Sequence, residues 1–208
     1  MKTFSQITFA LLTMSAVAVA QPKADKAPAP PPAKDSKAQV APTVPPAKDA
    51  KAAPTVPTEL VEMAKATTGT WKCKGEAMEP DGSKTPITAT NKAKADLDKW
   101  WIAETLEVKG MKMGVLKIAT YTTFDAASKK WRRIALTNSG GQMVGTADAT
   151  PVGQPMVFNL DTLGPMGSGQ FRDHADPSDP KAGLKVWGEL SVDKGKTWMK
   201  AYEMTCKK

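Results

Sequence analysis

From Thr70 to Cys206, apolar and polar residues alternate with a period of two, the pattern of strands with one buried and one solvated face. Turn signals such as Pro80-Asp81-Gly82 and Ser139-Gly140-Gly141 interrupt this alternation at short intervals. The pattern predicts strands over residues 70–78, 85–95, 100–108, 114–124, 131–137, 142–150, 156–160, 184–192 and 197–206. Short strands joined by tight turns favour an antiparallel meander that closes into a barrel or flattens into a sandwich.

A short helix is predicted just before the first strand. Over residues 58–65, Leu60, Met63 and Ala64 fall on one face at helical spacing, and Thr58 is placed to cap the first turn. We expect this apolar face to lie across one end of the strands.

The two cysteines of the chain lie in the first and last predicted strands, at Cys73 and Cys206. An even cysteine count in an oxidising compartment predicts one disulfide, whereas a zinc site would need about four ligands and the chain adds only His174. A bridge between these residues requires the first and last strands to be neighbours, which is what closure into a barrel supplies. The sequence therefore predicts one all-β domain over residues 58–208.

The N-terminal residues have the pattern of a secretory signal peptide. Lys2 precedes an apolar stretch over 7–19 that is too short to span a bilayer, and Ala18-Val19-Ala20 places small residues before a break. We expect residues 1–20 to be removed between Ala20 and Gln21. No cysteine lies near that bond to carry a lipid anchor. The expected location is periplasmic or secreted, with no transmembrane segment in the mature chain.

Residues 21–57 are rich in Ala, Pro and Lys, contain no aromatic residue, and repeat the motif Pro-Pro-Ala-Lys-Asp at 31–35 and 45–49. Such a segment has too little apolar area to offset the entropy of ordering, so it is predicted to be a disordered linker. The chain carries a net charge of +8, but residues 58–208 hold 22 basic and 18 acidic side chains, a difference of +4. This mild excess argues against nucleic-acid binding and suggests weak contact with an anionic cell envelope through the linker.

Several short motifs resemble a known group of barrels. Gly69-Thr70-Trp71, preceded by a helix, resembles the Gly-x-Trp opening of the calycins, which include lipocalins and fatty-acid-binding proteins. The closing residues 193–198 and 202–205, and the hairpin around 121–131, resemble an uncharacterised bacterial domain family with a lipocalin-like fold, fifteen-seventy-nine in the domain-of-unknown-function series. The resemblance implies a single antiparallel calycin-like β-barrel of about nine to ten strands with an interior cavity. It implies no established activity.

Candidate catalytic residues are few. His174 is the only histidine, and its surroundings over 172–177 read as a polar, solvated loop, which disfavours both haem ligation and a cation site formed with nearby aspartates. The chain has no Gly-x-Ser-x-Gly elbow, and both cysteines are expected to be bonded. We therefore predict a protein that is not an enzyme and that uses no cofactor.

The methionine residues raise an alternative hypothesis. Met111 and Met113 lie close together in the sequence, and thioethers select Cu(I), so these residues are a candidate copper site. The alternative is that methionine fills irregular apolar space or lines an adaptable ligand surface.

The leading functional hypothesis is binding of a small apolar or amphiphilic molecule in the barrel cavity. The predicted ligand-binding residues, placed in the interior or at the mouth, are Trp71, Trp101, Arg132, Trp187 and Tyr202. The alternative is an envelope-associated domain that has a solid barrel and acts through its surface. Copper binding or catalysis comes third.

Overall fold

The computed structural model describes residues 54–79, 81–165 and 167–208. The predicted signal peptide, the bond between Ala20 and Gln21, and most of the predicted linker (21–57) lie outside these residues. Within the described part, no helix is long and apolar enough to cross a membrane.

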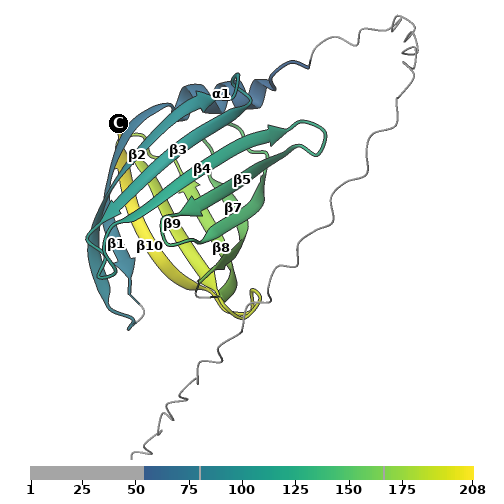
Figure 1. The fold of residues 1–208 in the computed structure, drawn as a ribbon. Helices are drawn as coiled ribbons and strands as arrows, with labels where there is room; N and C mark the ends of the chain where they lie inside the picture. The colour runs from purple at the N-terminus through teal and green to yellow at the C-terminus, as the bar shows by residue number, and fades with distance from the viewer. Residues whose placement is uncertain (1–53, 80, 166) are drawn as a thin grey trace, which may run out of the picture. The chain divides into compact units, whose positions relative to one another are not determined.

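One helix is followed by a series of strands (Figure 1). The elements are α1 (Thr58–Thr67), β1 (Gly69–Met78), β2 (Lys84–Asp96), β3 (Trp101–Lys109), β4 (Leu116–Asp125), β5 (Lys130–Thr137), β6 (Gln142–Asp148), β7 (Met156–Gly164), β8 (Gly167–Asp176), β9 (Leu184–Ser191) and β10 (Met199–Lys207).

The strands form one closed antiparallel barrel. Each strand pairs with its neighbours in sequence, and β1 pairs with β10 to complete the ring. The predicted single all-β barrel with a short N-terminal helix is confirmed. Strand β8 was not predicted, because its polar residues were read as a loop. That reading is wrong: polar side chains lie on both faces of this strand, so alternation gave no signal.

Helix α1 lies across one end of the barrel, where it contacts β2, β3 and β4 (Figure 1). It begins at Thr58, and Pro57 occupies the N-cap position without a side-chain hydrogen bond. The predicted capping role of Thr58 is therefore wrong, because this residue is already inside the helix. Leu60 is 1 % exposed and anchors the helix, and Val56 packs against the same apolar cluster, so ordered packing begins before residue 58.

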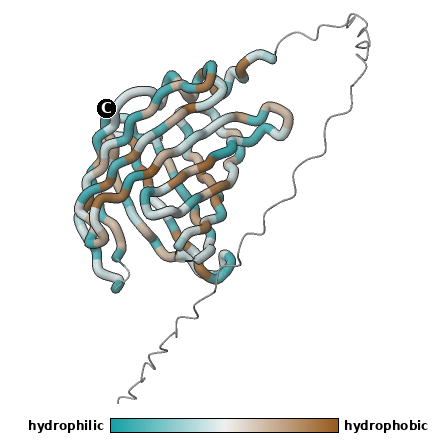
Figure 2. Tube along the Cα trace, viewed as in Figure 1, coloured by the Kyte–Doolittle hydropathy of each residue, from teal (hydrophilic) through white to brown (hydrophobic). Residues whose placement is uncertain are grey.

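Buried apolar side chains form two separate clusters inside the barrel, consistent with the alternation of hydrophobic and hydrophilic residues along the strands in Figure 2. The helix-side cluster contains Leu60, Ala93, Ile102, Phe124, Trp131, Ala147, Met156, Phe158 and Leu160. The disulfide-side cluster contains Cys73, Ala77, Ile87, Ala89, Val108, Met204 and Cys206.

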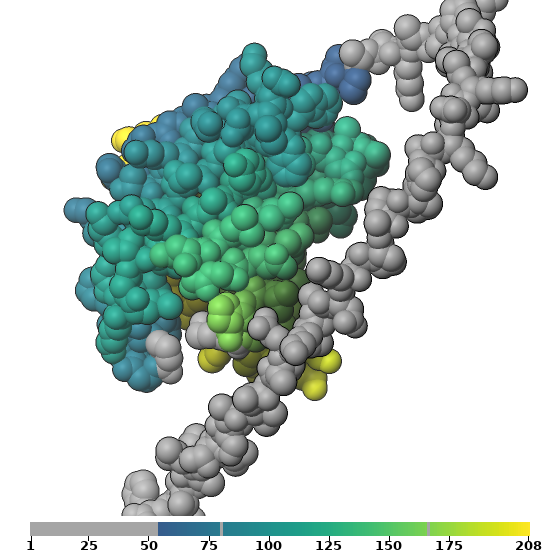
Figure 3. Space-filling view, in the orientation of Figure 1, coloured from purple at the N-terminus to yellow at the C-terminus, as the bar shows by residue number. Residues whose placement is uncertain are grey.

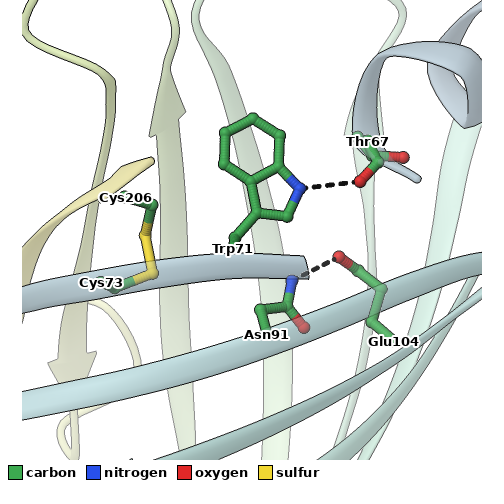
Figure 4. Close-up of a disulfide and its surroundings, with 6 residues drawn as sticks. All are labelled: Thr67, Trp71, Cys73, Asn91, Glu104 and Cys206. Atoms are coloured by element: carbon green, nitrogen blue, oxygen red, sulfur yellow. Dashed lines mark hydrogen bonds between the residues drawn. A yellow bond between two sulfur atoms is a disulfide. The ribbon is translucent and has the colours of Figure 1, made fainter. Parts of the chain in front are cut away.

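The two cysteines lie directly opposite each other where β1 meets β10. Their Sγ atoms are 2.03 Å apart and their Cα atoms 4.0 Å apart, which makes them a disulfide (Figure 4). Beside them, a Cβ on Gly75 would lie 1.9 Å from the carbonyl oxygen of Glu203. Only glycine permits this close approach of the two strands that close the barrel.

Candidate functional site: a charged cluster inside the barrel

Arg133 of β5 points into the barrel. It shares the inner face with Trp131, and its guanidinium Nη1 donates to Asp173 Oδ2 on β8 over 2.6 Å. Its Nε donates to Thr122 Oγ1 on β4 (3.2 Å), and its Cζ lies 3.7 Å from the ring centroid of Phe158 on β7. Strands β5 and β8 are not neighbours in the sheet, so the bond between Arg133 and Asp173 crosses the barrel interior.

Asp173 accepts a second hydrogen bond, from the phenol of Tyr202 on β10. Removal from water, together with the charge of Asp173 and this hydrogen bond, raises the pKa of Tyr202 well above its usual value of 10.0, against an opposing effect of Arg133. The Tyr202 ring stacks on Phe171 with centroids 6.3 Å apart. Gly188 makes this possible, because a Cβ there would lie 2.3 Å from an atom of each ring.

Glu104 of β3 is the second inward carboxylate. Its Oε1 accepts from Asn91 Nδ2 on β2 over 3.0 Å (Figure 4). Its Oε2 lies 4.0 Å from Arg133 Nη2, which is an ion pair without a hydrogen bond. The other amide atom, Asn91 Oδ1, is buried and has no hydrogen-bond partner in the described part of the chain.

We call these residues the interior polar cluster: Asn91, Glu104, Thr122, Arg133, Asp173 and Tyr202. The cluster lies between the two apolar clusters. On β2, for example, Asn91 separates Ala89 of the disulfide-side cluster from Ala93 of the helix-side cluster. Its side chains form a polar layer between two apolar ones.

The charged members of the cluster are not fully enclosed, although they face inward. The side chains of Arg133, Glu104 and Asp173 are 18 %, 19 % and 25 % exposed, whereas the inward-facing Trp131 is 2 % exposed. Solvent-sized space therefore adjoins the charged groups inside the barrel. A cavity that is largely apolar with a few convergent polar groups is the usual form of a small-molecule site.

Two of the five predicted ligand-binding residues face this interior. Tyr202 belongs to the interior polar cluster. Trp71 lies on the inner face of β1, directly opposite Asn91, and donates its indole N–H to the carbonyl of Thr67 at the end of α1 (2.8 Å; Figure 4). The Nζ of Lys208 lies 4.9 Å from the Trp71 ring centroid and donates to the carbonyl of Ala66.

The other three predicted residues lie on the outer face. Trp101 contacts the edge of Tyr121, Arg132 pairs with Asp125, and Trp187 stacks on His174 with ring centroids 4.5 Å apart. None of them contributes to the interior, because each occupies the strand parity opposite to that of the buried side chains.

His174 lies within β8, not in a loop, and its Nε2 is 3.2 Å from Glu189 Oε2 on the outer face. The methionine pair does not converge either: Met111 packs against the disulfide-side cluster, whereas Met113 is 64 % exposed. The described residues hold no group of three or more His, Cys, Asp or Glu side chains arranged to bind a metal.

Sequence reasoning missed Glu104, placed Asp173 in a polar loop, and included Arg132 but not Arg133 among the ligand-binding residues. One signal was available: Arg133 shares strand parity with the apolar Trp131 and Ala135, which are both 2 % exposed. A charged residue within such an inward-facing series is unusual and marks a functional or paired group.

The barrel is similar in fold to solved structures. It matches Rv2717c from M. tuberculosis with a TM-score of 0.54 and 12 % identity, over 73 % of this chain and 98 % of that one. It also matches the S-type phycobiliprotein lyase CPES from Guillardia theta with a TM-score of 0.48 and 13 % identity, over 71 % and 90 % of the two chains. The predicted fold class, a single closed antiparallel β-barrel, is confirmed, and a likeness at these identities extends to fold alone.

No protein-family model matches the chain, and no curated protein matches it. Membership of the domain family fifteen-seventy-nine thus stays a prediction.

Proposed function

We propose that this protein is exported and binds one small amphiphilic molecule inside its barrel, without transforming it. The observation that carries the proposal is the partial exposure of Arg133, Glu104 and Asp173 on the inner face, between two buried apolar clusters. A molecule with a polar head and an apolar tail fits this arrangement, with its head at the charged side chains and its tail against an apolar cluster. Its tail would gain about 0.8 kcal/mol for each methylene group that it buries.

The cysteine pair supports the exported location, because disulfides persist in oxidising compartments. Several aromatic residues that face inward, among them Trp71, Phe171 and Tyr202, support binding of an organic molecule, since rings supply much of the contact area in such sites.

Native mass spectrometry of the protein purified from the exporting cell, before and after organic extraction, is the direct test. The proposal predicts an extra mass that extraction removes. Displacement of the neutral fluorescent probe N-phenyl-1-naphthylamine then measures affinity in the extracted protein.

A matched pair of variants tests the place of binding. Thr120 faces inward on β4 opposite Glu104, whereas Thr105 is exposed on the outer face of β3. Thr120→Phe fills interior space and is expected to weaken probe binding at least about tenfold, a loss of about 1.4 kcal/mol. Thr105→Phe adds the same ring outside and is expected to leave binding unchanged. Equal effects of the two substitutions would refute an interior site.

One observation favours a second candidate function, contact with a partner surface. Tyr121, Ile134 and Val144 are cross-strand neighbours on the outer face of β4, β5 and β6, and they are 38 %, 40 % and 45 % exposed. Strands β4 and β5 lie on the side of the barrel that Figure 3 shows. An exposed apolar row of this kind is typical of contact surfaces. Co-sedimentation with anionic vesicles, compared between the protein and the charge-neutral variant Ile134→Asn, tests it.

A further inference from the structure

The interior polar cluster has an excess of acid. Arg133 contributes one positive charge, and Glu104 and Asp173 contribute two negative charges, so the ionised cluster carries a net charge of −1. Among the described strand residues that share the inner-face parity, no other Asp, Glu, Lys, Arg or His occurs. Lys208 donates to the carbonyl of Ala66, and its Nζ lies 4.9 Å from the centroid of the inward-facing Trp71 ring, but among the described residues it forms no ion pair with Glu104 or Asp173. One negative charge inside the barrel is therefore unbalanced.

The position of the surplus charge follows from the hydrogen bonds. Asp173 is fully engaged, because its two oxygens accept from Arg133 and Tyr202. Glu104 is less well paired: its Oε2 is 4.0 Å from the guanidinium and accepts no hydrogen bond from the described residues. Since an ionised carboxylate accepts at both oxygens, Glu104 Oε2 is the carboxylate oxygen of the cluster that lacks a donor among the described residues.

A second acceptor beside Glu104 also lacks a donor. Because Asn91 turns its Nδ2 toward the carboxylate of Glu104, its Oδ1 is left with no partner in the described part of the chain (Figure 4). A buried acceptor without a donor costs stability until one reaches it. Glu104 Oε2 and Asn91 Oδ1 thus both lack an N–H donor among the described residues, and a bound molecule could supply one.

An aromatic face adjoins these acceptors. Trp71 lies opposite Asn91 across the ladder between β1 and β2, and its indole N–H is already bonded to Thr67. The electron-rich ring attracts cations, and the Nζ of Lys208 already lies over one face, 4.9 Å from the centroid, so a bound ammonium group would use the opposite face. Trp71 also packs against the disulfide-side cluster, which would receive an apolar tail.

We propose that the polar head of the bound molecule is a protonated amine, which binds between Glu104, Asn91 and Trp71. An ammonium group has three N–H donors and one positive charge, so it supplies both the missing donors and the missing charge. This inference rests on the proposed function and names the chemical class of its ligand.

The test compares three probes that share one tail: decylammonium, decanol and decanoate. Each displaces N-phenyl-1-naphthylamine from the extracted protein, below its critical micelle concentration. We expect decylammonium to bind at least about tenfold more tightly than decanol, in line with a charge-assisted hydrogen bond, and decanoate to bind more weakly than decanol.

Glu104→Gln is expected to reduce the preference for the amine over the alcohol at least about fivefold. The matched control is Glu107→Gln on the same strand, whose carboxylate lies on the outer face and pairs with Lys109. It is expected to keep the preference. If Glu104→Gln fails to give the native circular dichroism spectrum, the ranking of the three probes by the unaltered protein decides alone.

The outcomes separate the two proposals. Equal affinity for all three probes would overturn the amine head while leaving the interior site in place. Tightest binding of decanoate would also overturn it and would make Arg133 the anchor. Failure of every probe to bind would overturn the proposed function and the amine head together.

Discussion

Removal of Arg133 should destabilise the barrel more than removal of either acid that it faces. Arg133→Met leaves Glu104 and Asp173 as two inward carboxylates without a cation, so the charge of the cluster falls from −1 to −2. Asp173→Asn changes it from −1 to 0, keeps an oxygen that can accept from Tyr202, and leaves Arg133 paired with Glu104.

The structure sets the size of each effect. Arg133→Met loses a charge-assisted hydrogen bond of about 1.5 to 3 kcal/mol and a bond to Thr122 of about 1 kcal/mol. It also loses stacking over Phe158 of about 1 kcal/mol, while the methionine side chain recovers part of the packing. Because an unpaired charge stays behind, we expect a net loss of about 3 to 5 kcal/mol in the free energy of unfolding. For Asp173→Asn we expect about 1 to 2 kcal/mol.

Urea unfolding of the oxidised protein, followed by tryptophan fluorescence and circular dichroism, measures these differences. The double variant Arg133→Met with Asp173→Asn should lose at least about 1 kcal/mol less than the sum of the single variants, since the two side chains are in contact. A larger loss for Asp173→Asn than for Arg133→Met, or strictly additive losses, would refute the charge argument.

Three further expectations follow from the same interior. Gly188→Ala should cost about 1 to 3 kcal/mol by forcing the rings of Phe171 and Tyr202 apart, measured as a lower urea midpoint; an unchanged midpoint would contradict the contact. Burial raises the folded-state pKa of Tyr202, so the contribution of its neutral phenol to the free energy of unfolding is fully present below pH 10 and is lost as the pH rises from there, by up to about 1.4 kcal/mol per pH unit. Tyr202→Phe should therefore lose stability less steeply than the unaltered protein at alkaline pH. Parallel pH profiles of the two proteins would count against this expectation. Reduction of the disulfide between Cys73 and Cys206, which are 133 residues apart, should lower the free energy of unfolding by about 2 to 5 kcal/mol. The circular dichroism signal of the strands should remain, because the backbone pairing of β1 with β10 does not depend on the disulfide. Loss of that signal on reduction would contradict this expectation.

The architecture could be predicted from the sequence, because inward-facing and outward-facing residues alternate with a period of two along the strands that close the barrel. Trp71 and Cys73 share one parity near the start, Tyr202 and Cys206 share one near the end, and the pairing of first and last strands follows from the cysteines. These are local patterns joined by one covalent constraint, and both can be read from a single chain.

The site was predictable only in part. Trp71 and Tyr202 were selected because they are large rings, and both face inward. Arg132 was selected in place of Arg133, because adjacent charged residues are normally assigned to solvent and only the parity of Trp131 distinguishes the two. Asp173 was assigned to a loop, since β8 carries polar residues on both faces. Contacts between strands that are not neighbours leave no periodic signal in the sequence.

Closure by β1 and β10 also determines the order in which this barrel is completed. The strands that carry Cys73 and Cys206 are separated by 133 residues, so their pairing has a larger loop-closure entropy cost than the local hairpins. We therefore expect this pairing to form after the hairpins. Until then β1 is an open sheet edge, the kind of edge that recruits strands from other chains. Lys72 and Lys74 point outward along it, and such charges oppose edge-to-edge pairing. The pairing of β1 with β10 thus also removes the open sheet edges through which the folding chain could aggregate.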